Sequence, residues 1–298
     1  MIEFYLPGVY EAFGLNIYFI ELLQEHPEYF YPDITIKAVY GAFPGAIWNG
    51  GRVRRDVITY EEIQPIIEDY NSHNVGIKYT WTNPCLQSIH LSNYFCNYIM
   101  DLSKDCPLNE VIINSPILEK YIREKYPNMP LISSTTKVLT TTDAINEELK
   151  KDYKLVVLDF RKNIDFDFLS KIENKDKIEL LINAYCGPEC ANRKAHYQEM
   201  GLAQLGIPIP QGERLDCSLA PSFCVAIGRP TFIGVEDLYE KYYKELGFSH
   251  FKIEGRSLQY NERLQNYVYY LIQPQYHTQV LVDCYNKVYL FSEKGELL

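Results

Sequence analysis

The sequence predicts an α/β protein, namely a (β/α)8 TIM-like barrel with a long cysteine-bearing insertion between strands seven and eight. Three observations predict this fold. Eight short β-type apolar runs alternate with helical patterns along the 298 residues. Several runs, such as 155–158 and 180–182, are apolar without interruption, which is typical of strands buried on both faces. No G-x-G-x-x-G motif follows the first run, which disfavours an open dinucleotide-binding sheet.

The elements can be placed in order along the chain. A capping box from Thr59 to Glu62 and the Ser115-Pro116 pair each predict a helix start. Further helices are expected over 117–126, 143–151, 165–172, 237–246 and 259–271. The predicted strands are Glu3–Leu6, Ile34–Tyr40, Gly76–Thr82, Glu110–Asn114, Leu131–Ser134, Lys154–Asp159, Lys177–Asn183 and His250–Glu254.

The end of the chain is predicted to differ from the barrel. Runs at 279–282 and 288–291 flank Asn286-Lys287, a pattern that indicates a small hairpin. We therefore expect a barrel over 1–274, which includes the cysteine-rich insertion 184–249, and a C-terminal hairpin extension over 275–298.

Charge and hydropathy limit the function classes. The net charge of −10 argues against an extended nucleic-acid surface. No apolar run approaches the length of a membrane span, and Met1–Pro7 has no basic leader, so we expect a cytoplasmic protein without a membrane partner. Small-molecule or carrier-bound substrates fit this charge better than naked RNA does.

Four of the eight cysteines gather in the insertion. Cys186 and Cys190 have C-x3-C spacing, and Cys217 and Cys224 have C-x6-C spacing. Thiolates are ligands for zinc and for iron–sulfur centres, and structural zinc usually has tighter pairs. The pattern thus favours a [4Fe-4S] cluster, with zinc as the alternative and ordinary buried thiols as a third reading. Nearby His196 is a candidate ligand, proton donor or helix cap.

Polar residues at the predicted strand ends are candidates for a pocket. In a barrel, all of them lie at one mouth. The loop Trp48–Arg52 adds a Gly-Gly pair, which allows close backbone approach, and an arginine suited to a carboxylate or phosphate. The other candidates are Thr82-Asn83, Asn114-Ser115, Ser133-Ser134-Thr135, Asp159 with Arg161, Asn183, Glu254 with Arg256, and the rings of Tyr5 and Tyr40.

The last predicted strand carries a recognisable motif. Phe251-Lys252-Ile253-Glu254-Gly255-Arg256 resembles the K-I-E-G-R signature of the collagenase-like peptidase family, peptidase class U-32. The runs ending at Asn114-Ser115-Pro116 and at Asn183, with Cys186 close behind, are similar to that family too. The resemblance covers 75–260 loosely and 177–256 best. The cysteine spacing departs from the family's usual pattern, and we expect no counterpart of the extra C-terminal domain of larger members.

The resemblance implies a TIM barrel and an iron–sulfur protein, since characterised relatives support oxygen-independent hydroxylation of tRNA, ribosomal RNA or ubiquinone precursors. It implies that Cys186, Cys190, Cys217 and Cys224 hold the cluster. We expect an iron–sulfur-dependent modification enzyme in which Arg256, Glu254, Asn183 and Arg52 are the catalytic residues. Some relatives work as paired subunits, so a protein partner is also expected.

Two alternatives stay open. One is a peptidase with a cysteine nucleophile, such as Cys186 with His196. No H-E-x-x-H motif supports a metallopeptidase. The other alternative is a non-enzymatic protein with a structural zinc site.

Overall fold

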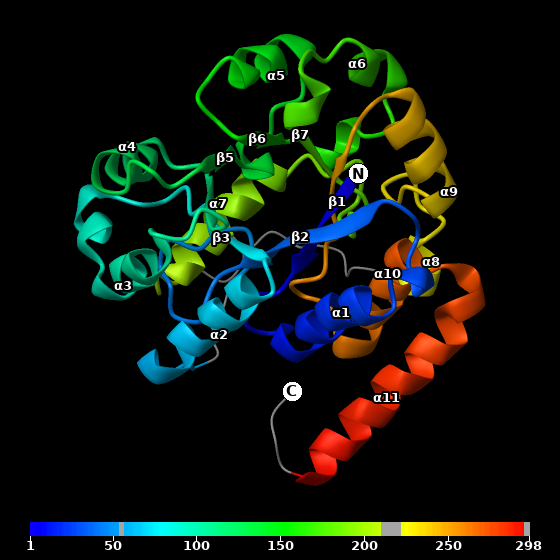
Figure 1. Ribbon diagram of the computed structural model, residues 1–298. Coiled ribbons are helices and arrows are strands. Elements are labelled where there is room, and N and C mark those ends of the chain that lie inside the picture. The colour runs from blue at the N-terminus through cyan, green and yellow to red at the C-terminus, as the bar shows by residue number, and fades with distance from the viewer. Residues whose placement is uncertain (54–56, 210–221, 295–298) are drawn as a thin grey trace.

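The protein is a closed barrel of eight parallel strands in the order β1 to β8, as a computed structural model shows (Figure 1). The structure describes residues 1–53, 57–209 and 222–294. The strands are β1 Ile2–Pro7, β2 Ile34–Gly41, β3 Gly76–Trp81, β4 Glu110–Ile113, β5 Leu131–Ser133, β6 Leu155–Val157, β7 Ile178–Leu181 and β8 His250–Lys252. Strand β8 pairs with both β7 and β1, which closes the sheet. The (β/α)8 prediction and its eight strands are confirmed.

Helices surround the barrel on the outside (Figure 1). They are α1 Phe13–Glu25, α2 Tyr60–Ser72, α3 Tyr94–Ser103, α4 Pro116–Lys125, α5 Thr142–Leu149, α6 Phe166–Ser170 and α10 Tyr260–Leu271. The predicted capping box holds the start of α2, where the backbone N–H of Thr59 donates to Glu62 at 2.7 Å. Short 3-10 turns also occur: η1 Pro27–Tyr29, η2 Ser88–Ser92, η3 Thr135–Lys137, η4 Phe160–Lys162, η5 Lys175–Lys177 and η7 Pro274–Tyr276.

Two separate cores follow from the alternation of side chains along each strand. One set of residues packs between the sheet and the helices and includes Phe4, Ile77 and Phe251. The other set fills the inside of the barrel. Its members are Tyr5, Ala38, Tyr40, Ile112, Ile132, Leu155 and Val157.

The connection between β7 and β8 carries more than the usual crossover helix. It contains α7 Arg193–Gln204, α8 Phe223–Ala226 and α9 Val235–Asp237, and α9 continues into the π-helix η6 Leu238–Glu245. Residues 210–221, which include Cys217, lie outside the described residues.

The predicted C-terminal hairpin is wrong, because the segment forms the helix α11 His277–Lys294. Val280 and Cys284 are both buried and stand four residues apart, so they share one face of a helix. That face packs near α1, where the Lys287 ammonium lies 4.6 Å from the ring of Tyr18. In Figure 1, α11 lies outside the ring of barrel helices. In the described part of the chain, no helix is long and apolar enough to cross a membrane.

Candidate active site at the barrel mouth

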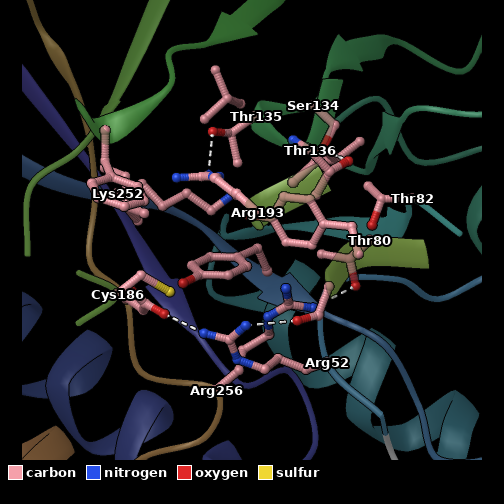
Figure 2. A pocket seen from close by; sticks show the side chains of 18 residues that line it. Arg52, Thr80, Thr82, Ser134, Thr135, Thr136, Cys186, Arg193, Lys252 and Arg256 are labelled. Carbon is pink, nitrogen blue, oxygen red and sulfur yellow. Dashed lines mark hydrogen bonds and ion pairs between the residues drawn. The ribbon is translucent and has the colours of Figure 1, made fainter. Parts of the chain in front are cut away.

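A small polar pocket lies at the carboxyl ends of the strands (Figure 2). Its cavity volume of about 70 Å³ corresponds to roughly five or six water-sized positions. The pocket thus suits a group of a few non-hydrogen atoms. A larger recess of about 470 Å³ adjoins it and shares Arg52, Cys186, Arg193 and Tyr197 with it. The lining residues of the pocket are Tyr40, Gly51, Arg52, Thr80, Thr82, Ile112, Ser134, Thr135, Thr136, Val157, Phe160, Leu181, Cys186, Arg193, Tyr197, Lys252, Glu254 and Arg256.

The lining is strongly cationic. Arg52, Arg193, Lys252 and Arg256 face a single carboxylate, Glu254, among the described lining residues. Hydroxyl groups of threonine, serine and tyrosine and the apolar side chains of Ile112, Val157, Phe160 and Leu181 complete the wall. Figure 2 shows Arg193 on the side of Thr135, with Arg52 and Arg256 across the pocket. An arrangement of this kind can bind an anion through charge-assisted hydrogen bonds.

The one carboxylate is already neutralised. Nη2 of Arg52 lies 2.5 Å from Oε1 of Glu254, and the backbone N–H of Tyr185 donates to Oε2 at 3.0 Å. Burial disfavours the charged form of Arg52, but Glu254, together with Cys186, Tyr197 and Tyr40, outweighs this effect and raises the pKa of Arg52. Nε of Arg52 donates to Ser257 at 2.6 Å. This pair therefore ties the loop after β2 to the loop after β8.

Asn183 lies behind the pocket and not in its wall. The side chain is fully buried. Its Oδ1 accepts the backbone N–H of Glu254 at 2.5 Å, and its Nδ2 donates to the carbonyl of Glu254 at 3.0 Å. A further bond at 2.7 Å joins it to Asn266 of α10. Asn183 thus fixes the backbone that carries Glu254, which makes it a positioning residue.

Arg256 crosses the mouth from β8 to β3. Its Nη1 donates to Oγ1 of Thr80 at 3.0 Å, and its guanidinium lies 5.6 Å from the ring of Tyr40. Burial lowers the pKa of Arg256 from its ordinary value, while the Tyr40 oxygen opposes this. Three of the four predicted catalytic residues (Arg52, Glu254 and Arg256) therefore meet in one pocket, although their catalytic roles stay a prediction.

Arg193, the first residue of α7, was not singled out from the sequence. It is 5% exposed, and its guanidinium lies 4.3 Å from the ring of Phe160 and 5.3 Å from that of Tyr197. Nη2 donates to Thr135 at 3.0 Å, and Nη1 lies 3.6 Å from Asp159. Nε and Nη1 have no hydrogen-bond acceptor among the described residues. Unused N–H groups on a buried cation indicate a place for an anion.

Charged side chains of alternating sign lie inside the barrel below the pocket, and we call this series, from Lys252 through Glu179, Lys78 and Glu110 to Lys154, the ladder. The Glu179 carboxylate lies between two lysines, 2.7 Å from Lys78 and 3.1 Å from Lys252. Glu110 lies 3.8 Å from Lys78 and also pairs with Lys154. Burial opposes ionisation of Glu179, but the two lysines hold its pKa at about 2. The signal for this ladder was present in the sequence, since charges inside otherwise apolar strands must be paired when buried.

Helix α7 covers the mouth. Its Gly201 carbonyl accepts from Nδ2 of Asn83 at 3.1 Å, and Nε2 of Gln204 donates to the carbonyl of Ala46 at 3.0 Å. A Cβ on Gly201 would lie 2.4 Å from Oδ1 of Asn83. Only glycine allows this approach. We call Arg193–Gln204 the α7 cap.

The predicted cysteine ligands are only partly brought together. Cys186 lines both the pocket and the recess, and Cys190 lines the recess. Cys224 is exposed on α8, and Cys217 lies outside the described residues. Within the described ranges, no group of three Cys, His, Asp or Glu side chains is placed to hold a metal ion. The described thiols therefore do not by themselves fit a cluster, and the four-cysteine site stays a prediction.

The remaining strand-end candidates divide into two groups. Thr82, Ser134, Thr135 and Tyr40 line the pocket. The others support the structure around it. Asn83 holds the α7 cap, Asn114 bonds Thr136 at 2.9 Å, and Asp159 pairs with Arg161 at 2.9 Å. Tyr5 lies lower in the barrel, where its ring is 3.0 Å from the ammonium of Lys78. His196 is half-buried beside the recess, and burial together with Arg52 lowers its pKa.

Comparison with known proteins establishes the fold. No protein-family model and no curated protein matches the sequence. A solved structure described as the U32 peptidase Mk0906 matches with a TM-score of 0.52 at 13% identity, over 86% of this chain and 94% of that one. The chain therefore shares the barrel fold of a protein from the family that its last strand resembles.

Proposed function

We propose that the chain is a divergent barrel enzyme related to the U32 peptidases and that its mouth binds a small anion or the anionic end of a larger substrate. The observation that carries this proposal is Arg193, which is buried between two rings with unused N–H groups at a cationic pocket. Arg52 is paired with Glu254, so the cations that remain for a ligand are Arg256, together with Arg193 and Lys252, which also lie 3.6 Å from Asp159 and 3.1 Å from Glu179.

The pocket and the recess can accommodate either form of ligand. The pocket fits a carboxylate, sulfate or phosphate group with few further atoms. The recess has room for the remainder of a larger molecule. Both kinds of ligand are compatible with a small-molecule or carrier-bound substrate.

The experiment is a calorimetric titration with sulfate. Wild-type protein is expected to bind sulfate, and Arg193→Met is expected to weaken binding by roughly tenfold or more, because hydrogen bonds from a charged donor are lost. Arg123→Met is the matched control. Arg123 belongs to α4 and pairs with the exposed side chain of Asp152. It does not line the pocket, so the variant removes the same charge at another place. Failure of the wild type to bind sulfate, or equal weakening in both variants, contradicts the proposal.

The finer proposal is the iron–sulfur-dependent hydroxylation or related modification that the family resemblance implies. It is supported by the position of Cys186 and Cys190 beside the pocket and by the soft-ligand chemistry of thiolates. It also requires Cys217 and Cys224 to join them. Iron and sulfide analysis of anaerobically purified protein tests it.

A peptidase reaction is a second candidate that one observation favours, since Cys186 and His196 border the same recess. The lowered pKa of His196 keeps the imidazole neutral and able to accept a proton. Loss of a hydrolytic activity on alkylation of Cys186, in protein free of metal, is the result that would support it.

A further inference from the structure

We propose that Lys252 is a nucleophilic amine that condenses with the carbonyl group of a small oxo acid held in the cationic pocket. The inference rests on the proposed function, because the carboxylate of the oxo acid would occupy the anion site. It adds a substrate class and a reactive atom to that site.

The position of Lys252 is the first support. It is the only amine among the described residues that line the pocket, and its residue is 7% exposed. It is the last residue of β8, and its ammonium lies 3.9 Å from the centre of the Tyr40 ring. The amine is thus held at the floor of a cavity that is open to a ligand and otherwise shielded from solvent.

The surroundings of Lys252 are the second support. Its neighbouring carboxylate, Glu179, is shared with Lys78, so Lys252 has only part of the negative charge of that group. The pocket wall adds Arg256 nearby. Burial, assisted by Lys78 and Arg256, lowers the pKa of Lys252 to about 8 against the opposing effect of Glu179. A useful fraction of the amine is therefore uncharged at neutral pH.

The arginines are the third support, since they orient the carbonyl. Arg193 on one side and Arg256 on the other can hold a carboxylate above the floor of the pocket. The cavity of about 70 Å³ leaves room for roughly six non-hydrogen atoms, the size of a three-carbon 2-oxo acid. A carboxylate held by the arginines then brings the adjacent carbonyl carbon to Lys252, the only amine among the described lining residues.

The step balances without an oxidant or reductant. The ammonium first loses one proton, and the lone pair of Nζ then forms a bond to the carbonyl carbon while the π electrons of the carbonyl move to oxygen. That oxygen takes up the released proton and a second proton from the nitrogen. The C–O bond then breaks and water leaves as the nitrogen lone pair forms the second C–N bond. The products are a protonated imine on Lys252 and one water molecule.

The test uses pyruvate as the probe oxo acid with cyanoborohydride as the trapping reagent, followed by peptide mapping of the full chain. We expect roughly tenfold or more adduct at Lys252 than at Lys120, because the arginines hold the carboxylate of pyruvate beside the amine. Lys120 belongs to an exposed pair on α4 and reports background reaction. Acetone, which has the ketone but no carboxylate, should give a much smaller preference for Lys252 than pyruvate does. Excess sulfate should suppress the Lys252 adduct.

Two variants make the outcome decisive. Lys252→Arg keeps the positive charge and should lose the adduct. Lys252→Met also removes the charge, so it should lose the adduct and weaken sulfate binding as well. Sulfate binding without a preferred Lys252 adduct in the wild type overturns this inference and leaves the anion site intact. An absence of sulfate binding overturns the proposed function instead. An adduct at Lys252 that acetone gives equally well also overturns the inference.

Discussion

Oε1 of Glu179 lies 3.1 Å from Nζ of Lys252, while Oε2 of the same carboxylate lies 2.7 Å from Lys78. One buried carboxylate on β7 therefore compensates two ammonium groups from β8 and β3, which approach it from the pocket and from the barrel interior. The stability of the barrel and the chemistry of its mouth consequently depend on the same side chain.

Removal of this carboxylate should destabilise the fold. Glu179→Gln leaves two buried ammonium groups with only Glu110 nearby, and loss of one partner of a buried ion pair typically costs about 3–5 kcal/mol. The free energy of unfolding from urea titration measures the effect. Glu147→Gln removes an exposed partner of Lys150 and should change the free energy of unfolding little. Equal effects of the two substitutions would contradict the role of the ladder.

The same carboxylate predicts acid sensitivity. Its pKa is about 2 in the folded protein against an ordinary 4.5. A depressed pKa gives stabilisation that is complete above 4.5 and is lost as the pH falls towards 2. Unfolding measured between pH 6 and pH 3 should therefore show a steeper loss of stability in the wild type than in Glu179→Gln. Parallel curves for the two proteins would exclude Glu179 as the source.

Sulfate affinity should depend on the charge of Lys252. The pKa of about 8 means that the ammonium is present below pH 8 and is lost above it. Affinity should be greatest below pH 8 and should fall as the pH rises through that value, since sulfate itself keeps its charge there. Calorimetry at a series of pH values measures this fall. In Lys252→Arg the affinity should stay level, and a fall of the same size in that variant would implicate another group.

The α7 cap should depend on the absence of a side chain at position 201. Gly201→Ala places a methyl group 2.4 Å from Oδ1 of Asn83, so the cap must shift. Hydrogen exchange over 193–204 should rise, and sulfate affinity should fall, because Arg193 moves with the cap. Gly228→Ala is the control, since nothing lies within 4 Å of a Cβ there. Unchanged exchange in Gly201→Ala would show that the cap is not held at this point.

The four-cysteine hypothesis is tested by the iron and sulfide content of the protein. It expects about four iron and four sulfide per chain in anaerobic protein, lost in both Cys186→Ala and Cys217→Ala. Cys96→Ala should keep them, since Cys96 is buried in the outer core. Zinc in place of iron would assign a structural role to the thiols. Protein without metal under these conditions would leave the cysteines as thiols.

The barrel was predictable because its signals are local. Apolar runs and caps mark each strand and helix, and polar residues after the strands predicted the mouth. The prediction of a C-terminal hairpin was wrong because tertiary packing outweighs the local sequence pattern there. The runs of apolar residues at 279–282 and 288–291 fit strands by local pattern, whereas Val280 and Cys284 are buried on one helical face of α11. Arg193 was missed because it comes from the insertion and reaches the pocket only when α7 folds back over the barrel.

The α7 cap divides the pocket between two parts of the chain with different tasks. The barrel supplies the floor, with Lys252 and Tyr40, and the inserted helix supplies the ceiling, with Arg193 and Tyr197. A barrel built in this way can acquire a new ligand preference through substitutions in one surface segment, while the strands that hold the molecule together stay unchanged. The residues that set selectivity are therefore to be sought in the insertion, and those that set reactivity in the strands.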